Sequence, residues 1–181
     1  MAAGLEVLKS DGYAGLTTAK VAARAGQNKA LIGYHYGSKQ GLVAAVAREV
    51  TEQITAEVLE GLGEPRTAAE LVDGLVAGIW GVIRRDDRLA RVYFDLASHS
   101  VVEPPVRAMM SEMKANFRAT LRRLLGMIED RPRPRDCDAA AVYLIAGVEG
   151  LALERLDRGE TAELRRARDL WTKSAAVAIS T

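Results

Sequence analysis

The side chains best suited to hold another molecule lie between Thr17 and Lys39. This stretch carries four basic side chains, one histidine and two tyrosines, and it contains no acidic residue. Ammonium, imidazole and phenol groups can donate hydrogen bonds to phosphate oxygens. Gly26 lies in the middle of the stretch and separates two short runs of helix-forming residues. The pattern indicates a pair of short helices that contacts a polyanion.

Catalytic and metal-binding chemistry is not indicated by the rest of the chain. The only histidines are His35 and His99, and the only cysteine is Cys137. We find no metal-spaced cluster, glycine-rich phosphate loop or nucleophile motif. We therefore expect a protein that is not an enzyme and needs no metal or cofactor. A single cysteine excludes an internal disulfide, and we interpret Cys137 as an incidental thiol near the start of a helix.

The distribution of charge supports contact with a polyanion at one end of the chain. Residues 1–48 hold six basic and two acidic side chains, whereas the whole chain has a net charge of only +1. The remainder is therefore mildly acidic. A basic head on an acidic body suits a protein that meets nucleic acid through its N-terminal part.

These side chains must be positioned by helices, because composition favours an all-α fold. The chain has 181 residues, of which 49% are hydrophobic, 27% are charged and only 5% are aromatic. No apolar run reaches the roughly 18 to 20 residues that span a bilayer. The first residues lack the unbroken apolar core of a secretory signal. We expect a cytoplasmic protein.

Proline, glycine and capping residues divide the chain into about nine helices. Every proline falls between periodic segments, as expected for a residue that breaks helix interiors. Thr17 and Asn28 are placed as N-caps on either side of the Gly26 turn, and Ser38 caps a longer helix. The predicted helices cover approximately residues 2–10, 17–25, 29–34, 39–62, 67–84, 87–98, 105–127, 137–157 and 162–179.

The first three helices form a helix-turn-helix unit in this interpretation. Val21 and Ile32 are expected to be buried between the second and third helices, which leaves the start of the third helix free to enter a major groove. Lys29 can then donate to guanine and Ala30 can touch a thymine methyl group. Thr18, Lys20 and Lys39 are placed beside phosphates.

A longer series of residues narrows this interpretation to one family. Between Gly12 and Leu42 the chain reads GYAGLTTAKVAARAGQNKALIGYHYGSKQGL, which combines the turn glycine with the Tyr-His-Tyr-Gly-Ser-Lys end. Over about residues 2–48 it resembles the DNA-binding domain of TetR/AcrR-type transcriptional regulators. The resemblance implies that Tyr34 and His35 contact the DNA backbone. The predicted DNA-binding residues are Thr17, Thr18, Lys20, Gln27, Asn28, Lys29, Ala30, Tyr34, His35 and Lys39.

The N-terminal region departs from the family pattern in two places. Gly33 stands where relatives usually carry a tyrosine that binds a phosphate, and a glycine inside a helix costs about 0.5–1 kcal/mol against alanine. The chain also begins within the first helix, without the basic arm that many relatives carry. Tyr13 and Tyr36 are interpreted as core or hinge aromatics.

The resemblance implies that residues 49–181 form a helical ligand-binding and dimerisation domain. The last two helices would pair with those of a second copy in a four-helix bundle, although they could instead complete a monomeric core. The predicted interface residues are Ala141, Ile145, Val148, Leu151, Trp171 and Ala175. The predicted ligand pocket, suited to a mainly apolar organic molecule, comprises Trp80, Ile83, Phe94, Met109, Met110, Met113, Phe117 and Tyr143.

The implied function is ligand-responsive transcriptional regulation. A homodimer would bind a palindromic DNA operator as a repressor, and a small organic inducer would release it. The sequence is also compatible with a regulator that activates transcription. The alternative is a dimeric helical module that binds protein partners and has lost operator binding, which Gly33 and the missing arm would favour.

Overall fold

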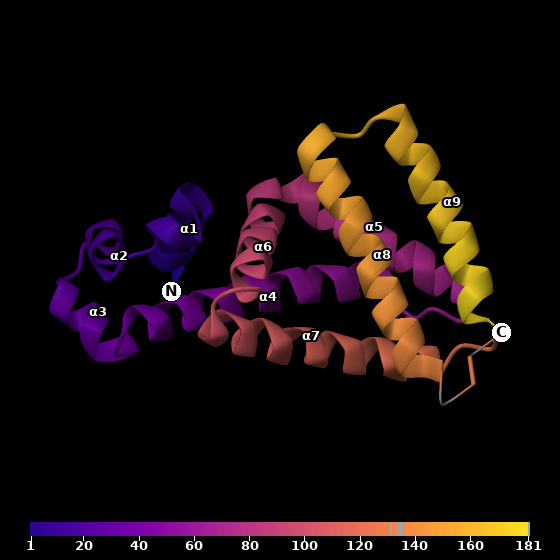
Figure 1. The fold of residues 1–181 in the computed structure, drawn as a ribbon, viewed down its shortest axis with the longest axis horizontal. Coiled ribbons are helices and arrows are strands. Elements are labelled where there is room, and N and C mark those ends of the chain that lie inside the picture. The colour runs from indigo at the N-terminus through magenta and orange to yellow at the C-terminus, as the bar shows by residue number, and fades with distance from the viewer. Residues whose placement is uncertain (131, 134–135, 181) are drawn as a thin grey trace. The chain divides into compact units, whose positions relative to one another are not determined.

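The computed structural model describes residues 1–130, 132–133 and 136–180. Within these ranges the secondary structure is entirely α-helical, with nine helices and no strand (Figure 1). The all-α prediction is therefore confirmed. The helices are α1 (Ala2–Gly15), α2 (Thr18–Ala25), α3 (Lys29–Tyr36), α4 (Lys39–Leu62), α5 (Ala68–Arg85), α6 (Asp87–Ser100), α7 (Pro104–Leu125), α8 (Cys137–Arg158) and α9 (Ala162–Ile179).

The chain forms two compact units that do not coincide with a simple division of the sequence. Unit 1 comprises Met1–Ile54 and Arg88–Met113, and unit 2 comprises Thr55–Asp87 and Lys114–Thr181. Helix α4 passes from unit 1 to unit 2 after Ile54, and α7 does so after Met113. The N-terminal helices thus share their unit with α6.

The core of unit 1 joins α1 to the start of α4. Leu5 and Leu8 are buried, as the sequence predicts, and Gly4 lies so close to α4 that an added Cβ would meet the side chain of Val46 at 2.6 Å. The sequence predicts that α1 ends at Asp11–Gly12. The helix instead continues to Gly15, but Gly12 has φ +69° and interrupts the helical backbone. Only glycine adopts this conformation without steric cost.

The core of unit 2 depends on close contact between helix backbones. At the crossing of α4 and α5, a Cβ on Gly61 would lie 2.6 Å from the Cα of Gly78. A Cβ on Gly78 would in turn lie 2.8 Å from the Cα of Val58. A Cβ on Gly74 would likewise lie 2.9 Å from the Cα of Leu62. The two helices can approach this closely only because these three positions lack a side chain.

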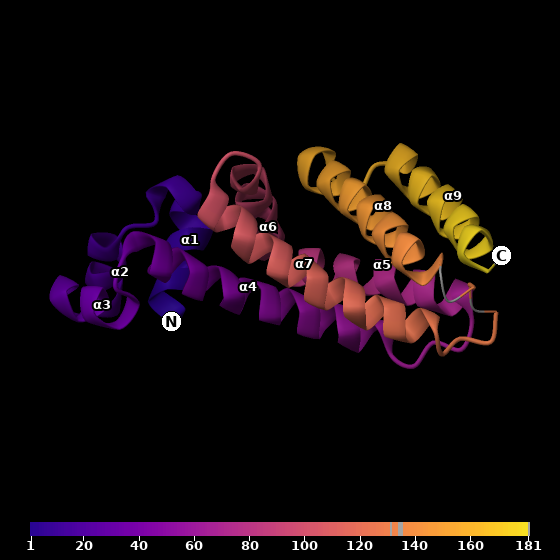
Figure 2. The ribbon, with the colours of Figure 1, turned by 60° about the horizontal axis from the view of Figure 1, so that its bottom comes forward.

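Helices α8 and α9 form an antiparallel pair in unit 2, and α5 packs against both of them (Figures 1 and 2). A short connection joins the two helices, and Thr161 caps α9 by accepting a hydrogen bond from the N–H of Leu164 at 3.1 Å. The indole of Trp171 packs directly onto Gly147, where an added Cβ would overlap the indole ring. This contact fixes how closely α8 and α9 approach.

The helix boundaries follow the predicted caps closely. The side chain of Ser38 accepts from the N–H of Gly41 at 3.0 Å in the first turn of α4, as predicted, and Thr67, which was not predicted as a cap, caps α5 by accepting from the N–H of Glu70. Helix α3 extends to Tyr36, two residues beyond the prediction, and is followed by Gly37 at φ +69°. Across the described residues, none of the helices has the length and apolar content needed to cross a membrane.

Candidate DNA-contacting surface

The turn between α2 and α3 is built by the residues that the sequence singles out as caps. The hydroxyl of Thr17 accepts a hydrogen bond from the N–H of Lys20 at 3.2 Å, and the side-chain oxygen of Asn28 accepts from the N–H of Ala30 at 2.9 Å. Gly26 takes the left-handed conformation, with φ +62°. The side chains of Thr17 and Asn28 therefore serve the helix ends, and their role in DNA binding remains a prediction.

One face of α3 is buried and the other is free. Val21 and Ala22 of α2 and Ile32 of α3 are buried, which confirms the predicted packing between these helices. The remaining side chains around the start and outer face of α3 are exposed, and Tyr34 is 85% exposed. We call this exposed set the α3 surface: Gln27, Lys29, Ala30, Tyr34 and His35.

Leu31 adds to the α3 surface an apolar residue that was not predicted. Its side chain is 41% exposed although it is large and apolar. The signal was present in the sequence, because Ile32 is the residue that faces α2 and its neighbour Leu31 must then point about 100° away around the helix. An exposed leucine beside Ala30 can contact a thymine methyl group.

The predicted phosphate-binding lysines are placed differently from one another. Lys20 is exposed but forms an ion pair with Asp11 at 2.5 Å, and the hydrogen bond from Lys20, together with one from Ser10, holds the pKa of the Asp11 carboxyl below its usual value. The ammonium group of Lys39 lies over the ring of Tyr13, 5.5 Å from its centre, and remains exposed. Thr18 is half-buried at the start of α2.

The eight predicted pocket residues belong to both units. Phe94, Met109, Met110 and Met113 lie in unit 1, whereas Trp80, Ile83, Phe117 and Tyr143 lie in unit 2. Trp80, Ile83 and Met110 are buried, and Tyr143 is exposed on α8. Their role in binding a ligand remains a prediction.

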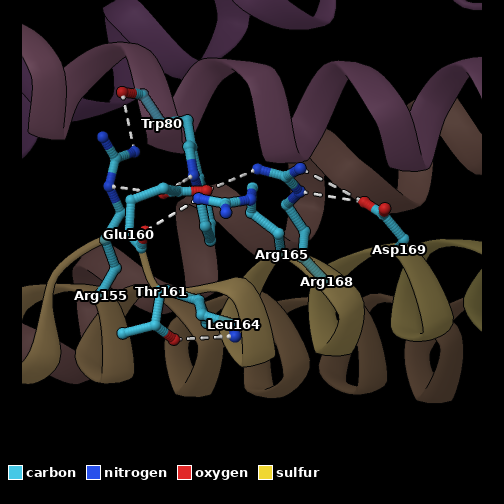
Figure 3. Close-up of polar contacts among 8 residues, drawn as sticks. All are labelled: Trp80, Arg155, Glu160, Thr161, Leu164, Arg165, Arg168 and Asp169. Atoms are coloured by element: carbon cyan, nitrogen blue, oxygen red, sulfur yellow. Dashed lines mark hydrogen bonds and ion pairs between the residues drawn. The ribbon is translucent and has the colours of Figure 1, made fainter.

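Of these residues, Trp80 has its polar group, the indole N–H, hydrogen-bonded within the chain (Figure 3). Its indole N–H donates to Glu160 at 2.9 Å, and the guanidinium groups of Arg155 and Arg168 lie 5.1 and 5.6 Å from the ring centre. Glu160 also pairs with Arg155 at 3.3 Å and with Arg168 at 3.0 Å. Trp80 therefore anchors the connection between α8 and α9 to α5.

The predicted dimer residues are mostly part of the interior of unit 2. Ala141, Ile145, Val148 and Ala175 are buried within the single chain, and Leu151 and Trp171 are half-buried. Other large apolar side chains on the same two helices are exposed instead, and sequence reasoning did not assign them to this interface. We call this set the α8–α9 surface: Val142, Tyr143, Leu153, Leu170 and Val177.

Among the described residues, no group of three or more His, Cys, Asp or Glu side chains is placed to hold a metal ion. The pKa of the Arg155 guanidinium is lowered by burial, an effect that the charge of Glu160 opposes.

Comparison with known proteins identifies both ends of the chain. Residues 1–46 match the profile of the family described as bacterial regulatory proteins, tetR family, and residues 82–177 match that of the BetI-type transcriptional repressor, C-terminal. The HTH-type transcriptional regulator BetI of Cronobacter sakazakii is 26% identical over 94% of this chain and 84% of its own length.

Solved structures show the same fold. A putative transcriptional regulator from Pseudomonas aeruginosa PAO1 superposes with a TM-score of 0.80 at 22% identity, covering 99% of this chain and 87% of the other. The transcriptional regulator FadR from Bacillus subtilis, solved in complex with stearoyl-CoA, superposes with a TM-score of 0.76 at 18% identity, covering 98% and 96%.

The second profile alone covers more than half of the chain, and the first covers the helix-turn-helix region. Both describe regulators of transcription and neither describes an enzyme. The chain belongs to the TetR family of bacterial transcriptional regulators.

Proposed function

We propose that this regulator is a repressor that binds a palindromic operator as a homodimer and releases it when a small organic molecule binds. The observation that carries the proposal is the α3 surface. Ile32 is buried against α2, while Lys29, Ala30, Tyr34 and His35 are left exposed on one short helix. These side chains combine base-reading and phosphate-binding groups. Residues 1–48 act as the DNA-binding domain and residues 49–181 as the ligand-binding and dimerisation domain.

The dimer forms through the α8–α9 surface. Monomeric proteins rarely expose large apolar side chains in a group, and such a group marks an interaction site. A second copy offers an identical surface and therefore satisfies a two-fold interface. Trp171 and Leu151, both half-buried, lie on the same helices and can contribute at its margin. The buried residues Ala141, Ile145, Val148 and Ala175 support the interface from within, by fixing α8 and α9 in place.

The ligand is proposed to be a small, mainly apolar organic molecule bound by the body of the protein in the cytoplasm. The FadR structure, which contains stearoyl-CoA, supports the idea that this fold accommodates organic ligands. Met109, Met113 and Phe117 are half-buried on α7 and offer adaptable apolar contacts. Phe94 and Ile83 are further candidates.

Release of DNA follows from a shift between two conformations. In a dimer the two copies of α3 must match successive major grooves, roughly 34–36 Å apart. A ligand that favours a conformation with a different spacing lowers operator affinity. To move most of the population, its preference for that conformation must amount to several kcal/mol.

The experiment is a fluorescence anisotropy titration of the full chain with duplexes taken from the promoters of its own and neighbouring genes. We expect affinity for one palindromic duplex to exceed that for a scrambled duplex by about 10³-fold or more at physiological salt. Affinity should also fall steeply as salt is raised, because phosphate contacts release counterions. Absence of salt-dependent binding to every duplex would instead support a protein-interaction module.

A further inference from the structure

A polar cluster in unit 1 connects α1 to α6 and to the short segment between α6 and α7. We call Tyr13, Asp95, His99 and Glu103 the Tyr13 cluster. The backbone N–H of Tyr13 donates to the carboxylate of Asp95 at 2.6 Å, and the Tyr13 hydroxyl donates a hydrogen bond to the carboxylate of Glu103. The rings of Tyr13 and His99 lie 4.3 Å apart. Both polar groups of Tyr13 are therefore held by acidic residues from one distant segment.

The break in α1 explains why Asp95 is needed. Gly12 leaves the helical conformation immediately before Tyr13, and Asp95 accepts the N–H that comes directly after this break. A Cβ at Gly12 would lie only 3.1 Å from the same carboxylate oxygen. Asp95 thus caps the second part of α1, as an aspartate caps the start of a separate helix. The orientation of this part of α1, which leads directly into α2, depends on α6.

His99 lies between the two carboxylates. Its Nδ1 is 3.1 Å from a Glu103 oxygen, and its Nε2 is 3.6 Å from an Asp95 oxygen. A neutral imidazole has one donor nitrogen and one acceptor nitrogen, whereas both nitrogens donate in the imidazolium ion. Carboxylates can only accept. The Glu103 contact is within hydrogen-bond distance, whereas the Asp95 contact is at the distance of an ion pair, so a protonated ring places a positive charge between the two carboxylates.

The other charged group at the cluster comes from α4. The ammonium group of Lys39 lies on the ring of Tyr13, so a predicted phosphate-binding residue also contacts this cluster. Burial and Glu103 raise the pKa of Tyr13 to about 12. Its hydroxyl therefore keeps its proton and continues to donate throughout the range in which histidine titrates.

We propose that Asp95, His99 and Glu103 are positioning residues that hold α1 in its DNA-binding orientation, and that protonation of His99 tightens this hold. The proposal rests on the proposed operator binding. When the His99 ring is neutral, only one of its nitrogens can donate, and Asp95 and Glu103 lack the positive charge between them. Operator affinity then falls through a residue that does not touch DNA.

The test uses the fact that the chain has only two histidines, His35 and His99. Operator affinity of the full chain is measured from pH 6 to pH 8 in a His35→Gln background, which removes the imidazole on the α3 surface. We expect affinity to fall about fivefold over this range, the equivalent of one hydrogen bond. In the His35→Gln/His99→Gln double variant, the fall should disappear. An unchanged pH profile in the double variant overturns the proposal.

A conservative pair of variants separates positioning from folding. Asp95→Asn keeps an oxygen that can accept from the N–H of Tyr13, so affinity at pH 8 should stay within about twofold of the parent while the pH dependence weakens. Asp95→Leu removes the acceptor and should lower affinity at both pH values, with the helical circular dichroism spectrum as a check on folding. If Asp95→Leu binds the operator as the parent does, the positioning role is refuted.

A second measurement keeps the inference testable if no operator binding is found. The protection factor of the Tyr13 amide against hydrogen exchange is measured by NMR in the free protein. We expect it to fall about fivefold between pH 6 and pH 8 in the parent and to stay constant in His99→Gln. Equal behaviour of the two proteins overturns the role of His99. A difference between them without any DNA binding contradicts only the proposed operator function.

Discussion

The α3 surface and the α8–α9 surface are both left unpaired by the single chain, but they expose opposite chemistry. The α3 surface presents ammonium, phenol and imidazole groups around one apolar neighbour, Leu31. The α8–α9 surface presents aliphatic side chains and one tyrosine. Exposed polar groups are solvated by water and therefore cost little free energy when no polyanion is bound. Exposed apolar groups, by contrast, lower the free energy when they are buried against one another. This difference in chemistry fits the proposed function, in which the α3 surface binds DNA and the α8–α9 surface binds a second copy.

The largest expected effect comes from placing a charge on the α8–α9 surface. Leu170→Glu should convert the dimer into a monomer, because a carboxylate cannot be buried unpaired in the interface. Operator affinity should fall by about 10²- to 10⁴-fold, since the two α3 helices no longer bind as one unit. The mass is measured by sedimentation and the affinity by anisotropy.

A matched control for this variant is Met127→Glu. Met127 and Leu170 are equally exposed, at 71%, but Met127 lies outside α8 and α9. It should leave both the mass and the affinity unchanged. A Leu170→Glu protein that remains dimeric would show that the α8–α9 surface has another role.

The next effect tests whether the α8–α9 surface depends on the packing beneath it. Gly147→Ala would push a methyl group into the indole of Trp171, and overpacking of this kind costs about 1–3 kcal/mol. The midpoint of thermal unfolding should fall. On the same helix, a Cβ at Gly150 meets nothing within 4 Å, so Gly150→Ala should preserve or raise the midpoint. Equal midpoints for the two variants would contradict this account of the packing.

Two lysine variants separate base reading by the α3 surface from phosphate binding by α4. Lys29→Ala should change the preference between operator duplexes that differ at one base pair, by about 1–3 kcal/mol. Lys39→Ala should weaken binding to all duplexes alike and reduce the salt-dependence slope by about one. Anisotropy titrations at several salt concentrations measure both quantities. A Lys29→Ala protein with unchanged preference would remove Lys29 from the base-reading group.

The smallest effect concerns Gly33 within α3. A Cβ at this position would meet nothing within 4 Å, so Gly33→Ala should favour the helix by about 0.5–1 kcal/mol and raise operator affinity a few-fold. Gly37→Ala is the contrasting variant, because Gly37 has φ +69° and should not tolerate a side chain. Lower affinity in Gly33→Ala would mean that the glycine permits a close approach to the DNA backbone.

Much of the fold could be predicted because the helix boundaries are set by capping side chains and turn residues that are local in the sequence. Thr17, Asn28 and Ser38 all act as the caps that the sequence indicates. The sequence predicts the break inside α1 as the end of the helix, since Gly12 signals a turn but not whether the helix resumes after it. The residues of the α3 surface could be named from the sequence for the same reason as the caps, because they lie within one short motif.

The α8–α9 surface could not be predicted to the residue for a physical reason. Helix α8 carries apolar side chains on both its buried and its exposed faces, so periodicity does not distinguish the core from the interface. Ala141 and Ala175, which the sequence assigns to the interface, are buried inside unit 2 instead. The Tyr13 cluster was equally hidden, because Asp95 and Glu103 are 82 and 90 residues from Tyr13 along the chain.

The crossing of α4 and α5 has a consequence for directed evolution of this regulator toward new inducers. At Gly61, Gly74 and Gly78 the two backbones touch, so each position accepts nothing larger than hydrogen. A randomised library should keep these three codons fixed and instead vary the half-buried Met109, Met113 and Phe117 of α7. Such a library would retain a higher proportion of folded variants than one in which the crossing is mutated.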